Sequence, residues 1–163
     1  MPRPVAIYTH QACELHDTGS GHPESPRRLP VIRKALEEAP FAESLHFYEA
    51  VPAETKWIEC IHTREYRTYI EETCLKGKST VDMGETLVCQ DSYDAALLSA
   101  GAAMKCVDAV FKEGYPAAFS LSRPPGHHAS EERAMGFCLF NNIAIAAHYA
   151  EQTYGLERLC ILD

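Results

Sequence analysis

Apolar residues recur along this chain in two patterns: short continuous runs, and positions three or four residues apart. The runs predict strands at 5–9, 45–48, 117–122 and 158–162. The helical spacing predicts helices at 26–39, 64–76, 92–111 and 141–152. Strands that alternate with helices indicate parallel β-α units, so we expect an α/β fold with a mostly parallel sheet flanked by helices.

Residues that favour helix ends support these assignments. Ser25 followed by Pro26 is typical of a cap and a first helical position, Thr63 and Asn141 can cap two later helices, and Gly155 can end the last. The buried face of the helix at 92–111 is expected to hold Ala96, Leu97, Ala100, Met104, Val107 and Phe111.

The last predicted strand ends at Asp163, the final residue of the sequence. Chain termini normally lie in exposed segments, and a buried strand is an unusual place for a domain to end. We therefore expect residues 1–163 to be the N-terminal portion of a single domain that is incomplete at its C-terminus.

Composition limits the cellular compartment and the classes of binding partner that we expect for this protein. The net charge is −8 and no basic cluster exists, so we expect no nucleic-acid partner. The seven cysteines form no C-x-x-C pair, which argues against a disulfide framework or a structural zinc cluster and favours a reducing cytoplasm. No apolar run is long enough for a signal peptide or a membrane span, and nothing indicates the oligomeric state.

The segment Arg123–Ala129, with the sequence RPPGHHA, carries the clearest chemistry. Its two prolines stiffen the backbone, and the glycine permits a close backbone approach. His127 and His128 then follow side by side. Imidazoles titrate near neutral pH, so the pair suits acid–base catalysis or metal binding, although many such pairs are merely structural.

A second block, MGFCLFNN at 135–142, follows closely. Gly136 and Phe137 can form one wall of a narrow apolar slot, or Phe137 can be an ordinary core residue. Asp163 follows a predicted strand, where it can orient a histidine or simply stabilise a turn.

Together these motifs resemble the histone deacetylase superfamily. The resemblance rests on RPPGHHA, MGFCLFNN, the Ala-rich helix after them, the final ILD, and HPESPRRL at 22–29, which is similar to the family's H-P-E-x-P-x-R-L motif. It extends over essentially the whole chain. Class II-like deacetylases, bacterial deacetylase-like amidohydrolases and acetylpolyamine amidohydrolases are the most similar groups.

The resemblance implies an arginase/deacetylase fold with a zinc ion at the bottom of a narrow tunnel. It implies hydrolysis of an acetyl-amide on an acetylated protein, a polyamine or a small acetylated molecule. His128 matches the main general base and acid, and His127 its electrostatic assistant. Asp163 matches a residue that pairs with the first histidine and helps to bind a structural monovalent cation such as K⁺.

Further positions match the substrate path of the family. The tunnel wall corresponds to Pro125, Gly136, Phe137 and Cys138, the last of which lies beside the metal. Arg28 matches an arginine near the channel for acetate release, and Glu85 falls near an acidic or polar position at the rim.

The family's zinc ligands follow the position of Asp163 and have no counterparts in this chain. We therefore expect the 163-residue chain to lack deacetylase activity by itself. Two alternatives stay open: a non-catalytic fragment that binds a partner or completes a split enzyme, and an arginase-like hydrolase with two manganese ions. The tandem histidines after R-P-P-G argue against the second.

Overall fold

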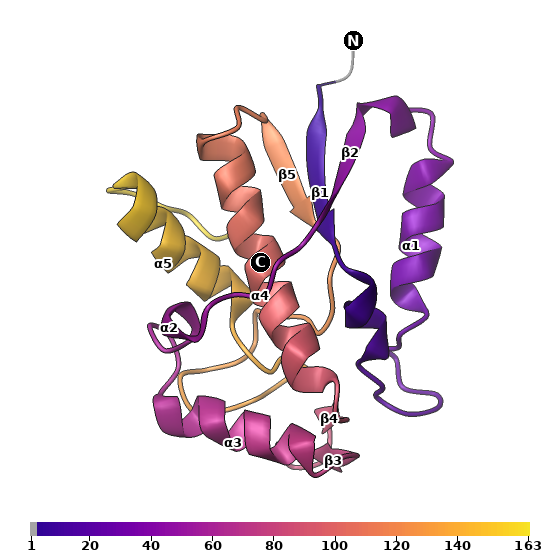
Figure 1. Cartoon of the computed structure of the whole chain (residues 1–163), viewed down its shortest axis with the longest axis vertical. Coiled ribbons are helices and arrows are strands. Elements are labelled where there is room, and N and C mark those ends of the chain that lie inside the picture. Colours follow the sequence, from indigo (N-terminus) through magenta and orange to yellow (C-terminus); the bar gives the residue numbers. More distant parts are fainter. Residues whose placement is uncertain (1–2) are drawn as a thin grey trace.

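A three-stranded parallel sheet forms the upper part of the computed structural model, which describes residues 3–163 (Figure 1). Strand β1 (Val5–Thr9) lies in the centre, between β2 (Leu45–Glu49) and β5 (Ala117–Ser120). Both neighbours run parallel to β1. The predicted α/β architecture, with a parallel sheet flanked by helices, is confirmed.

Residues 3–163 form five α-helices: α1 (Arg28–Glu37), α2 (Thr55–Ile58), α3 (Arg64–Leu75), α4 (Ser92–Phe111) and α5 (Asn142–Tyr154). Local capping explains two of their starts. The Thr63 side chain accepts a hydrogen bond from the backbone of Tyr66, and the Asn141 side chain accepts one from Ala144. Gly155 ends α5 with a φ of +66°, a conformation that glycine adopts without strain.

Helix α4 is the centre of the molecule, because it packs on β1 and β5 and also on α5 (Figure 1). Its small residues allow this close packing on two sides, so the buried surface is wider than the single face that we predicted, although Ala96 and Ala100 are buried as expected. Phe111, expected inside, is 49% exposed, whereas Ala95 and Ala102 are fully buried. At Gly101 the helix approaches the backbone of Val51 so closely that a Cβ atom would overlap the Val51 carbonyl.

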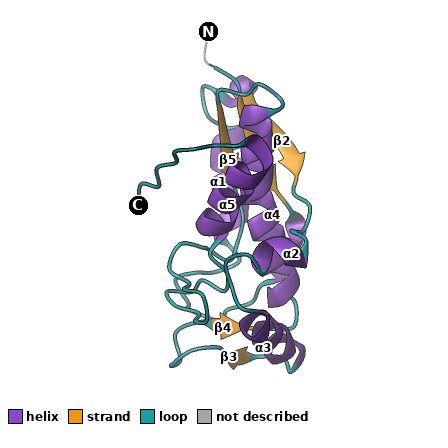
Figure 2. Cartoon of the chain, turned by 90° about the vertical axis from the view of Figure 1, so that its left-hand side faces the viewer, coloured by secondary structure: helices purple, strands orange, loops and turns teal. Residues whose placement is uncertain are grey.

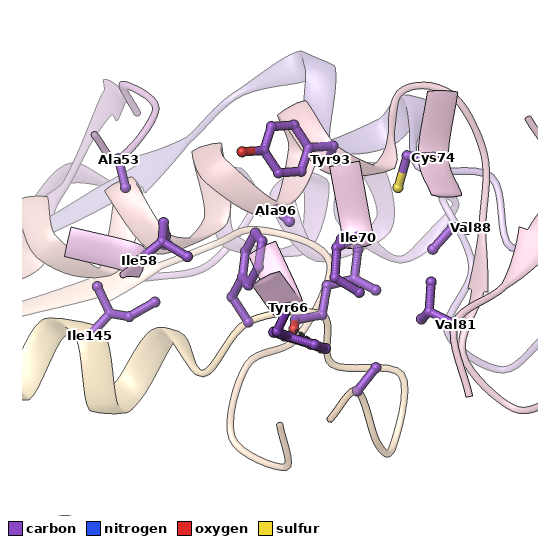
Figure 3. Close-up of a cluster of buried hydrophobic side chains, with 14 residues drawn as sticks. Ala53, Ile58, Tyr66, Ile70, Cys74, Val81, Val88, Tyr93, Ala96 and Ile145 are labelled. Atoms are coloured by element: carbon purple, nitrogen blue, oxygen red, sulfur yellow. Dashed lines mark hydrogen bonds between the residues drawn. The ribbon is translucent and has the colours of Figure 1, made fainter. Parts of the chain in front are cut away.

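A second apolar cluster lies below the sheet, between α3, α4 and the hairpin of β3 (Ser79–Thr80) and β4 (Leu87–Val88) (Figure 3). Ile70, Tyr66 and Phe140 are buried in it. The Tyr66 hydroxyl donates to the Leu139 carbonyl at 2.7 Å. This cluster therefore supports the underside of the loop that carries the tandem histidines.

Two sequence predictions are corrected. Helix α1 begins at Arg28 rather than Pro26, because residues before it form a turn in which the backbone of Arg28 donates to Ser25. Residues 158–162 form no strand: the segment reaches away from the sheet (Figure 2), and Leu162 is 93% exposed. A strand needs a partner for its backbone, and this segment instead borders a cavity of about 500 Å³ with α4 and α5.

Within residues 3–163, no helix combines the length and the apolar character needed to cross a bilayer.

Candidate active site

The loop 121–141 joins the carboxyl end of β5 to the start of α5. Parallel sheets commonly bind ligands beyond the carboxyl ends of their strands. The loop holds both motifs singled out in the sequence, so its conformation decides what the site can do.

Arg123 anchors the start of the loop through a buried ion pair with Glu24. Arg123 Nε donates to Glu24 Oε1 at 2.6 Å, and Nη2 donates to Oε2 at 2.7 Å. Both side chains are 2% exposed. The guanidinium also donates to the carbonyls of Cys13 and Glu24. A two-pronged pair of this kind fixes direction as well as distance, so the loop leaves β5 in one orientation.

His16 completes this buried cluster. Its Nε2 lies 3.7 Å from Glu24 Oε2, and its Nδ1 lies 2.7 Å from the hydroxyl of Ser92. Burial, helped by the positive charge of Arg123, lowers the pKa of His16 to about 4. The imidazole is therefore neutral at physiological pH and serves as a packed hydrogen-bonding group.

A chain of hydroxyl groups holds the next part of the loop. Ser99 Oγ donates to the Pro124 carbonyl at 2.8 Å and accepts from the Asn142 amide at 2.8 Å. Because Ser99 has a single proton, Ser122 must donate to it across their 2.8 Å contact. Pro124 is thus bonded to α4, and through Ser99 it is linked to the first residue of α5.

Gly126 is required by packing. A Cβ atom at this position would overlap the side chain of Asn142, and the Gly126 carbonyl accepts from the backbone of Ile143. Any larger residue would push the loop away from α5. The expectation of a close backbone approach at this glycine is confirmed.

His127 and His128 lie next to each other at the surface, with ring centroids 4.0 Å apart. Their backbone N–H groups both donate to the sulfur of Cys138, at 3.4 and 3.5 Å. Burial raises the pKa of the Cys138 thiol, so the sulfur stays neutral. Cys138 supports the pair from inside the protein, and the imidazoles remain accessible from outside.

Gly136 and Phe137 turn the chain back against this pair. A Cβ atom on Gly136 would lie 2.5 Å from His128 Cδ2, so the glycine backbone packs directly on the imidazole. Phe137 has a φ of +68°, which is rare for a residue with a side chain. Its N–H donates to Thr86 Oγ1 at 3.3 Å, and its ring meets the edge of His22 with centroids 4.7 Å apart.

The hairpin at 79–88 supports Phe137 from the rim. The Asp82 carboxylate accepts from the backbone of Gly84, Glu85 and Thr86, and from the Thr86 hydroxyl. Burial acts to raise the pKa of Asp82, but these hydrogen bonds outweigh it and lower the pKa to about 2. The exposed Glu85 lies in this turn, with its carbonyl 3.4 Å from His22 Nε2.

The structure brings His127, His128, Gly136, Phe137 and Cys138 together, with Pro125 just before them. Two other residues that the sequence predicted for the site, Arg28 and Asp163, do not contact this group. Arg28 is 54% exposed and lies 3.6 Å from Glu24, at the start of α1. Asp163 is exposed at the end of the segment after α5, and within residues 3–163 no hydrogen bond or ion pair reaches its carboxylate.

No set of three His, Cys, Asp or Glu side chains between residues 3 and 163 is close enough to hold a metal ion. The donor groups of this part of the chain therefore do not fit the zinc that the resemblance implies.

Sequence reasoning missed the residues that hold the loop. Glu24 and Arg123 both stood in motifs, but nothing in either motif indicates that they pair, because 99 positions separate them. Thr86, which accepts from the Phe137 backbone, gave no signal at all. Its role depends on a contact with a residue 51 positions away.

Known proteins with similar sequences and structures belong to the family that the sequence motifs resemble. Residues 22–163 match the family model described as the histone deacetylase domain. The chain is 42% identical to an uncharacterized protein of Synechocystis sp. over 98% of its own length, and 35% identical to a polyamine deacetylase of Rattus norvegicus over 86%. The crystal structure of the HDA15 HD domain superposes with a TM-score of 0.84 at 30% identity, over 93% of this chain.

The chain spans 53% of the length of the Synechocystis protein, 25% of the rat protein and 44% of the HDA15 structure. It thus corresponds to about half, or less, of the proteins that it matches. The match to the deacetylase model decides against the arginase-like alternative.

Proposed function

The chain belongs to the histone deacetylase family, and on that premise we propose that it supplies the proton-transfer histidines and one wall of the substrate tunnel of a zinc-dependent deacetylase. The observation that carries the proposal is the geometry of His127 and His128. They lie side by side and exposed, with the sulfur of Cys138 beneath them and the backbone of Gly136 against one ring. Such a pair is held in place yet open to substrate.

His128 is the general base and acid in this proposal. It takes a proton from the attacking water and gives one to the leaving amine, and His127 assists electrostatically. The contact with Gly136 supports this division, because it limits how the His128 ring can turn. Phe137, held by His22 and Thr86, provides the apolar wall along which an acyl chain would lie.

A zinc ion held by other parts of the complete enzyme would supply a Lewis acid for the acetyl carbonyl and for a bound water. Since residues 3–163 offer no fitting donor set, the proposal places the zinc ligands outside this part of the protein. By the same reasoning we propose that the 163-residue chain alone does not hydrolyse acetyl-amides. In the complete domain Asp163 would pair with His127 and help to bind K⁺.

The substrate class is an acetylated amine: acetyl-lysine in a protein, an acetylpolyamine or a small acetylated molecule. A polyamine deacetylase is among the relatives, and the acidic net charge of −8 suits cationic substrates. We propose that the exposed Glu85, on the hairpin that supports Phe137, attracts a charged amine at the rim. A cytoplasmic location stays a prediction.

The test is hydrolysis of an acetyl-lysine peptide and of an acetylpolyamine by the protein in the length that its gene encodes. We expect zinc-dependent turnover that His128→Asn lowers by about 10²–10⁴-fold, because a general acid–base group contributes that much. His127→Asn should lower it less. Full activity of His128→Asn would contradict the assignment, and turnover by the 163-residue chain would contradict its predicted inactivity.

A further inference from the structure

His62 lies just before α3 and is 2% exposed. It bonds to both ends of one segment of the tandem-histidine loop. Its Nδ1 lies 3.1 Å from the Glu131 carbonyl, and its Nε2 lies 2.9 Å from the backbone nitrogen of Asn141. Gly136, Phe137 and Cys138 lie between these two points, so one side chain ties the beginning and the end of the segment that contacts His128.

The two partners determine the protonation state of the ring. A carbonyl oxygen only accepts, so Nδ1 must carry a proton. A backbone N–H only donates, so Nε2 must be free of one. The bonded imidazole is therefore the neutral Nδ1–H tautomer. A proton added to Nε2 would face the N–H of Asn141 and remove that bond.

The surroundings oppose a charged imidazole. The ring packs against both Tyr66 and Phe140, with centroids 5.3 and 5.4 Å away. The titratable groups that face it are Tyr66 from α3 and Glu131 from the loop. Burial lowers the pKa of His62, which outweighs the opposite effect of its hydrogen bonds to the loop backbone and of the Glu131 charge.

We propose that His62 is a positioning residue that holds the 131–141 segment against the tandem histidines, and that its protonation releases this segment. The link to catalysis rests on the proposed deacetylase function, but the control of the loop does not. Acidification would remove the bond to Asn141, loosen Cys138 beneath the pair and disturb the orientation of both imidazoles.

The first experiment uses the unaltered 163-residue chain. Nitrogen chemical shifts of its labelled histidines report the tautomer and the charge of each ring. We expect His62 as the Nδ1–H tautomer, still neutral at a pH where an ordinary histidine is already protonated. A proton on Nε2 at neutral pH, or titration at the ordinary value, would overturn the proposal without any variant.

The second experiment measures amide hydrogen exchange. His62→Phe keeps the ring but removes both bonds, so exchange at His127, His128 and Cys138 should rise by about tenfold while α4 is unchanged. His62→Gln keeps a donor and an acceptor but cannot be protonated. It should restore protection and remove the loss of loop protection, measured relative to the intrinsic exchange rate at each pH, that the unaltered chain shows as the pH falls below about 6.5. His46→Gln, at an exposed site, should behave like the unaltered chain.

Two outcomes would contradict the proposal. Equal acceleration in α4 and in the loop would mean that His62 only stabilises the whole fold. An unchanged pH dependence in His62→Gln would assign the release to another group. Neither readout involves turnover, so failure of the deacetylase assignment would leave these results intact, and their failure would not bear on it.

Discussion

Glu24 and Arg123 form a buried ion pair across 99 positions of sequence, with both carboxylate oxygens bonded to the guanidinium. This pair joins the H-P-E segment to the first residue of the RPPGHHA motif in the tandem-histidine loop. The loop is held further by the Ser99 hydroxyl, by Thr86 and by His62. The candidate site is thus positioned by side chains from four separate parts of the chain.

Removal of one partner of this pair should destabilise the protein strongly, because it leaves an unpaired buried charge. We expect Arg123→Met to lower the free energy of unfolding by about 3–5 kcal/mol, measured by urea denaturation. Arg123→Lys keeps the positive charge but cannot form both hydrogen bonds to the carboxylate. It should lower the free energy of unfolding by less than Arg123→Met does. As a control, Arg33→Ala removes an exposed pair with Glu37 and should cost under about 1 kcal/mol. Equal losses would show that the buried pair has no special role.

Stability should fall in mild acid. The pKa of His16 is lowered to about 4 in the folded chain, whereas an unfolded histidine titrates near its ordinary value of 6.5. The unfolded state therefore binds more protons between these values. The stability that the neutral His16 contributes is fully present above about pH 6.5 and is lost as the pH falls towards about 4. The total loss is up to about 3 kcal/mol of the free energy of unfolding.

Urea titrations across this pH range would measure the slope. His16→Gln should flatten it, and an unchanged slope in that variant would contradict the assignment. His62 contributes in the same direction, because its pKa is lowered too.

Gly136→Ala should disturb His128 directly. The substitution places a Cβ atom 2.5 Å from the imidazole at a φ of +56°. Gly155→Ala is the matched control, since it has a φ of +66° and open space around it. Both should lose about 1–2 kcal/mol from backbone strain, but Gly136→Ala should lose more and also shift the imidazole signals of His128. Identical behaviour of the two variants would mean that the contact is unimportant.

Thiol reactivity should divide the cysteines by location. Cys60 and Cys160 are exposed, whereas burial raises the pKa of Cys138 and raises that of Cys74 and Cys106 to about 12. Iodoacetamide labelling at mildly alkaline pH, read by peptide mass spectrometry, should modify the exposed pair first. Rapid labelling of Cys138 would show that the loop above it opens readily.

The sequence by itself determined the features that depend on neighbouring residues. Apolar runs located the three strands of the sheet, and Thr63, Asn141 and Gly155 marked helix ends because a cap or a positive φ acts within a few residues. The two motifs also placed His127, His128, Gly136 and Phe137 near one another, because only a short loop separates them.

Only the tertiary structure decided the rest. An apolar run such as 158–162 becomes a strand only where another backbone pairs with it, and in this structure it stays unpaired. Glu24, His16 and His62 are likewise buried because residues distant in sequence bond to them. A charged or titratable side chain is stable inside a protein when distant groups satisfy it, and no local pattern records which groups those are.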